Sequence, residues 1–111
     1  MPDGIFGGVV AGSGGVTSDG DLNARAAGKG LRMHTGTAGD KAGTAILVGG
    51  TLVVANAAVT AASLIFLTCQ VPGGAPGWLQ VSARTAGVSF TILSSNGADT
   101  STVGWLIVEP S

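Results

Sequence analysis

Residues 78–93 read WLQVSARTAGVSFTIL, and this stretch decides the fold class. Apolar side chains alternate with other residues in each half of it, on the faces formed by Leu79, Val81 and Ala83 and by Val88, Phe90 and Ile92. A period of two is typical of a β-strand with one face buried. The sequence Thr85-Ala86-Gly87 between the halves is typical of a tight turn. The stretch therefore predicts two strands joined by a turn.

Further short runs suited to β-structure occur at residues 44–48, 51–56, 64–69 and 102–108. The Gly49-Gly50 pair between the first two runs predicts a hairpin. Residues 64–69 form an apolar run apart from Thr68, which predicts a strand buried on both faces. The Ala-rich residues 56–62 fit either a helical turn or a loose loop. Because no segment combines helix caps with a helical apolar stripe, we predict an all-β fold, a small antiparallel β-sandwich or barrel-like body.

The domain organisation follows from the glycine content. Many of the 20 glycines fall in residues 1–41, which predicts an extended, Gly-rich N-terminal arm preceding a β-body at residues 42–111. The arm is either a disordered tail or a segment that becomes ordered on a neighbouring protein. The second interpretation explains its apolar residues, and we predict that these are the anchors that contact that neighbour: Ile5, Phe6, Val9 and Val10.

Charge is scarce and unevenly placed. Charged residues make up 10% of the chain, against about 25% in an average soluble domain. After Lys41 only Arg84, Asp99 and Glu109 are charged. Such a body either hides much of its surface in contacts with other chains or faces water with uncharged polar groups. A body of about 70 residues without disulfides gains only ~3–5 kcal/mol from its own core, so we expect it to form a homo-oligomer.

Several classes of function find no support in the sequence. A net charge of −1 disfavours a nucleic-acid partner. Residues 46–67 are long enough to cross a membrane, but their glycine pair and polar residues favour two strands over a transmembrane helix. Cys69 and His34 are each the only residue of their kind, so we predict neither a disulfide nor a metal site. We interpret Cys69 as a small buried hydrophobe. No catalytic constellation or cofactor motif is present, and the chain is predicted not to be an enzyme.

The remaining chemistry lies in two tryptophans and two charges. Trp78 and Trp105 are the residue type that stacks on sugars, but no cluster of hydrogen-bonding partners surrounds either, which favours core or interface anchoring. Arg84 and Asp99 both flank turns and are either an ion pair, within or between subunits, or two unrelated surface charges. The predicted subunit interface comprises Phe66, Trp78, Arg84, Phe90, Asp99 and Trp105.

The sequence resembles a small β-module of tailed-bacteriophage virion proteins. The resemblance covers residues 27–110 and is strongest in VSARTAGVSFTI at 81–92. The other segments that carry it are AGKGLR at 27–32, KAGTA at 41–45, ASLIFLT at 62–68, PGGAPG at 72–77, DTSTV at 99–103 and WLIVEP at 105–110. Leu64 departs from the pattern, because related modules tend to have arginine there.

The resemblance implies a trimer and three settings: a head decoration (cement) protein, a head fibre, or the end domain of a tail fibre. The short arm, without a long shaft, favours a decoration protein on the capsid surface of the virion, with the major capsid protein as its partner. The alternative is a receptor- or glycan-binding module of a tail or head fibre.

Overall fold

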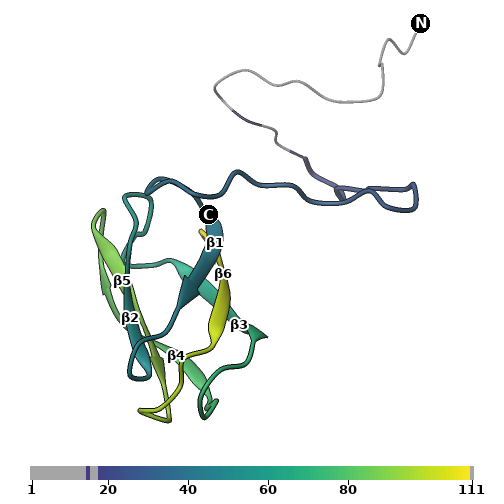
Figure 1. Cartoon of the computed structure of the whole chain (residues 1–111). Coiled ribbons are helices and arrows are strands. Elements are labelled where there is room, and N and C mark those ends of the chain that lie inside the picture. The colour runs from purple at the N-terminus through teal and green to yellow at the C-terminus, as the bar shows by residue number, and fades with distance from the viewer. Residues whose placement is uncertain (1–14, 16–17, 111) are drawn as a thin grey trace, which may run out of the picture. The chain divides into compact units, whose positions relative to one another are not determined.

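The computed structural model describes Gly15 and residues 18–110, and six β-strands form between residues 42 and 108 (Figure 1). No helix occurs in this described part, and therefore none that could span a membrane. The strands are β1 (Ala42–Ile46), β2 (Thr51–Ala55), β3 (Leu64–Val71), β4 (Leu79–Thr85), β5 (Ser89–Ser94) and β6 (Thr102–Val108).

The strands form two antiparallel sheets of three strands each, which lie face to face as a small sandwich (Figure 1). Sheet A has the order β1-β6-β3, and sheet B has the order β2-β5-β4. Neighbours pair antiparallel throughout both sheets. The predictions of an all-β fold and of an antiparallel sandwich are confirmed.

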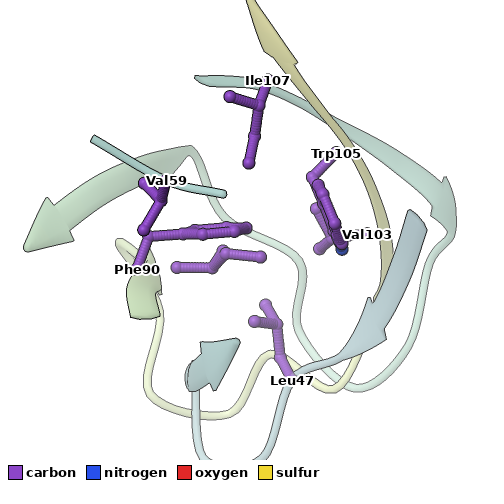
Figure 2. Packing of buried hydrophobic residues seen from close by; sticks show 7 residues of the cluster. Leu47, Val59, Phe90, Val103, Trp105 and Ile107 are labelled. Atoms are coloured by element: carbon purple, nitrogen blue, oxygen red, sulfur yellow. The ribbon is translucent and has the colours of Figure 1, made fainter. Parts of the chain in front are cut away.

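The core lies between the two central strands, β5 and β6. Alternate residues of each strand face inward, and with two loop residues they form the buried cluster of Leu47, Val59, Phe90, Ile92, Val103, Trp105 and Ile107 (Figure 2). The Phe90 and Trp105 rings meet edge to face, with centroids 5.2 Å apart and an angle of 73°. This geometry is a favoured one for aromatic pairs, and it joins the two sheets at their centres.

The predicted hairpin at Gly49-Gly50 is wrong, although the turn itself is present. Both glycines have positive φ (62° and 81°), and Val48 and Thr51 exchange two backbone hydrogen bonds across them. Beyond that turn the chain separates, because β1 pairs with β6 in one sheet and β2 pairs with β5 in the other. The Gly-Gly turn therefore connects the two layers of the sandwich. Residues 56–62, for which the sequence allowed either a helical turn or a loose loop, form a loop with turns and no helix.

The prediction that residues 64–69 are buried on both faces is also wrong. Ile65 and Leu67 pack against the core, but Leu64 and Phe66 are 50% and 57% exposed. The strand lies at an edge of sheet A, where only one face meets sheet B. Cys69, at the end of the same run, is exposed instead of buried.

The chain divides into two compact units, Met1–Leu31 and Arg32–Ser111. The described residues before Ala42 contain bends and turns but no strand. Within the second unit, this segment is tied to the sandwich: the Asn56 side chain donates a hydrogen bond to the Asp40 carbonyl (2.6 Å). The predicted arm boundary at residue 41 stays a prediction, and the predicted anchors Ile5, Phe6, Val9 and Val10 lie outside the described residues.

The Trp105 ring leaves no room for a side chain at Gly43 of β1. A Cβ on Gly43 would lie 2.7 Å from Trp105 Cζ2. Gly43→Ala should therefore lower the free energy of unfolding by roughly 1–3 kcal/mol through overpacking, measured by urea titration. Gly97→Ala is the control, because a Cβ there meets nothing within 4 Å. Equal stability of the two variants would contradict this account of the core.

Candidate functional site

The outer face of sheet A is uncharged. Pairing partners in an antiparallel sheet share a face, and the register places Phe66 opposite Leu106 and Leu64 opposite Val108. The side chains or Cα atoms on this face are those of Ala42, Thr44, Ile46, Leu64, Phe66, Thr68, Thr102, Gly104, Leu106 and Val108, and none of these residues is charged. We call this surface the A face.

The A face also exposes large apolar side chains. Leu64, Phe66, Ile46 and Val108 are all exposed, and Val71 adds another at the end of β3. Large exposed apolar side chains that gather on one sheet face make that face a candidate site of interaction. A groove of about 1070 Å³ extends over part of it, lined by Phe66, Leu106 and Thr44 and bordered by residues 35–38.

The A face is uncharged because the three charged residues of the body, Arg84, Asp99 and Glu109, lie elsewhere. Asp99 is buried where the loops before β4 and β6 meet. Its carboxylate accepts hydrogen bonds from Ser94 Oγ (2.6 Å), the Gly77 amide (2.9 Å) and the Ser101 amide (2.9 Å). Hydrogen bonds from Ser101, Ser94 and Gly77 hold the pKa of Asp99 far below its usual range, against the opposing effect of burial.

The other two charges lie at the opposite end of β6. Arg84 Nε donates to the Ser63 carbonyl (3.1 Å), and the Ser63 hydroxyl donates to the Glu109 carboxylate. Glu109 also accepts hydrogen bonds from Thr60 Oγ1 (2.7 Å) and Lys41 Nζ (3.1 Å). Hydrogen bonds from Ser63, Thr60 and Lys41 lower the pKa of Glu109. This network joins β4, the loop before β3 and the end of β6 at the surface of the sandwich.

The structure separates the six predicted interface residues into two groups. Phe90, Asp99 and Trp105 are buried within a single chain and present little side-chain surface to a second subunit. Phe66, Trp78 and Arg84 are exposed. Phe66 lies on the A face, whereas Trp78 precedes β4 of sheet B. The interface prediction therefore depends on the exposed group. Arg84 and Asp99 form no ion pair, because each bonds to other partners at opposite ends of the body.

Sequence reasoning missed most of the A face. Leu64, Ile46 and Leu106 alternate with inward-facing residues on their strands, but their neighbours are equally apolar, so periodicity alone did not separate the two faces. The strongest available signal was the absence of charge over three strand-like runs. A second missed group is the Ser94 and Ser101 pair, which holds Asp99.

The described residues contain no group of side chains arranged for catalysis or for metal binding. No group of three His, Cys, Asp or Glu side chains there could hold a metal ion. His34 Nδ1 lies 2.9 Å from Asp40 Oδ1, and Asp40 Oδ2 accepts a hydrogen bond from the Thr37 amide (2.7 Å). Mainly through that backbone hydrogen bond, the pKa of Asp40 is lowered. This pair organises the turn before β1.

One protein-family model matches most of the chain, including the whole sandwich. Residues 23–108 match the model of the C-terminal domain of K1 capsule-specific polysaccharide lyase. The chain belongs to this family. No curated protein and no solved structure matches the chain. The family is related to phage tail spikes, which agrees in broad terms with a phage structural module. The match includes all six strands, the Asp99 network and the A face, and it ends one residue before Glu109.

The Asp99 network predicts acid sensitivity. The native carboxylate has a lowered pKa, so its contribution to stability is present above the unfolded pKa of about 3.9 and is lost as pH falls through the folded pKa. Asp99→Asn should lower the melting temperature at pH 7 and flatten its decline below about pH 4, measured by circular dichroism. Asp19→Asn, at an exposed position, is the control. An Asp99→Asn variant that matched the wild type in both respects would refute the role given to this carboxylate.

Proposed function

We propose that this chain is a non-enzymatic phage virion protein that self-associates through the A face, as a trimer, and decorates the head. The observation that carries the proposal is the A face itself, an uncharged sheet surface with Phe66 and Leu64 exposed at its edge. Burying such a surface is favourable in proportion to its apolar area, by roughly 25 cal/mol per Å² before the costs of association.

A second copy is the partner that suits this face best. Charged partners gain nothing from it, because it offers neither a complementary charge nor an acidic or basic rim of its own. In a trimer the A faces of the three subunits would meet around the threefold axis, and such a contact needs only apolar complementarity. It also covers the edge strand β3, whose unpaired backbone groups would otherwise be open to uncontrolled pairing.

The family supports a structural role over a catalytic one. The family is that of the C-terminal domain of a lyase, and a domain of this kind is usually structural. The lyase activity on K1 capsule belongs to the proteins for which the family is named. We extend from them to this chain only the role of a virion module.

The finer part of the proposal concerns the head and the N-terminal arm. Residues 1–41 would reach the major capsid protein, with Ile5, Phe6, Val9 and Val10 as apolar anchors. A trimer carries three such arms, so weak individual contacts on a repeating shell would add up by avidity. Cross-linked capsid subunits would then resist internal pressure.

Self-association is tested by placing a charge on the A face. Phe66→Asp should convert the oligomer to a monomer, because burying the new carboxylate without a partner is costly. Light scattering coupled to size-exclusion chromatography measures the mass. Val53→Asp is the matched control, an exposed apolar position on an edge strand of sheet B, and should leave the oligomer intact. A wild-type chain that is monomeric at every concentration, or equal effects of both variants, would overturn the proposal.

Head decoration is tested with purified empty heads and purified tails. The wild-type chain should co-sediment with heads in many copies and not with tails. A variant lacking residues 1–20 should lose head binding while keeping its oligomeric mass. Binding to tails alone would place the module on a fibre, and undiminished head binding by the deletion variant would exclude the arm as the clamp.

A further inference from the structure

Trp78 is the most exposed aromatic side chain of the body, at 83%, and it does not belong to the A face. Its neighbour Leu79 packs against the core. Because successive side chains in an extended strand point to opposite sides, the indole lies on the outer side of sheet B. The sandwich thus presents two exposed aromatic residues, Phe66 and Trp78, on its opposite layers.

The backbone beneath the indole is fixed. The Trp78 amide donates to Ser95 Oγ (2.9 Å), and the Trp78 carbonyl accepts from the Ser95 amide (2.8 Å). The preceding residue, Gly77, donates its amide to the buried Asp99 carboxylate. The Asp99 network therefore holds the loop that carries Trp78, and the exposed ring is mounted on a rigid support.

The surroundings of the ring are polar and uncharged. Ser95 and Asn96 are exposed beside it, and Gln80 is the next outward residue on β4. Asn96 Oδ1 accepts from the Ala98 amide (2.8 Å), and its amide nitrogen donates no hydrogen bond among the described residues. Asp99, the one carboxylate at this end of the sandwich among the described residues, is buried and accepts three hydrogen bonds. Hydroxyl and amide groups around one aromatic face offer both stacking and hydrogen bonds.

We propose that Trp78, with Ser95 and Asn96, forms a carbohydrate-binding platform for an uncharged oligosaccharide. The apolar C–H face of a pyranose ring stacks on the electron-rich indole, and its hydroxyl groups bond to Asn96 Nδ2 and Ser95. A protein partner suits the site less well, because interface hot spots lie at the centre of an apolar patch, whereas this ring is surrounded by polar groups. A charged glycan finds no exposed counter-charge on this end of the sandwich, as far as the described residues of the second unit extend.

The platform can act together with self-association, and only that combination rests on the proposed function. Because the A face lies on the other sheet, an oligomer formed through it leaves each Trp78 exposed. Several platforms on one particle would raise the apparent affinity for a polymeric glycan without any new contact. Binding by a single platform does not require the oligomer.

The test uses the full chain on an array of neutral oligosaccharides, including hexose and N-acetylhexosamine oligomers, with K1 capsular polysaccharide as a further probe. Oligosaccharides that give signal are then titrated in solution by isothermal calorimetry. Trp78→Ala should weaken the solution Kd at least tenfold, Trp78→Phe should weaken it less, and Val53→Asp should leave it unchanged. Circular dichroism confirms the fold of each variant.

The proposal is overturned if no neutral glycan binds, if binding is confined to charged glycans, or if Trp78→Ala binds as tightly as the wild type. Phe66→Asp separates this proposal from the proposed function. A monomer that retains the solution Kd but loses array signal supports both. A wild-type oligomer that binds no glycan refutes the platform alone, and a wild-type monomer that binds through Trp78 refutes the oligomer alone.

Discussion

Phe90 and Trp105 meet edge to face between two sheets that share no strand, and this contact is the constraint on which the remaining structure depends (Figure 2). Each residue lies on the central strand of its sheet, so the pair sets how the layers face each other. The Trp105 ring requires a residue without a side chain beside it, and Gly43 supplies that space on β1. The indole Nε1 has no hydrogen-bond partner in the described part of the chain. Packing of the ring therefore outweighs the cost of an unpaired N–H, about 1–3 kcal/mol.

A sandwich of two three-stranded sheets buries one face of each sheet and leaves the other open. In this chain the few charges of the body do not protect the open faces. Asp99 holds the loops at one end of β6, and Glu109 with Arg84 joins segments at the other end. The consequence is a division of surfaces: the A face remains apolar, and the outer side of sheet B carries polar groups around Trp78. Because the few charged residues of the body lie at the two ends of the sandwich, the outer faces of both sheets carry no charge that would oppose a partner.

The sequence predicted what depends on neighbouring residues and missed what depends on distant ones. The alternation in residues 78–93 correctly indicated β4 and β5, because their pairing is local and one face of each is apolar. The pairing of β1 with β6 joins residues about 60 positions apart, and nothing near Gly49-Gly50 indicates it. An apolar run such as residues 64–67 of β3 has the same sequence pattern whether its second face lies in a core or on an open surface. The position of Trp78 could have been predicted, since inward-facing Leu79 and Val81 place it on the outer side. The convergence of Ser94, Ser101 and Gly77 on Asp99 could not, because it requires the folded loops.

The central claim is that the A face is the surface on which copies of this chain meet. Hydrogen–deuterium exchange at low and high protein concentration tests it most directly, because edge-strand amides become protected when a partner covers them. The account predicts that protection of β3 rises with concentration, with a smaller rise in β6, while β2 and β4 of sheet B exchange at constant rates. Exchange that is independent of concentration, or protection that appears on β2 and β4 instead, would contradict it.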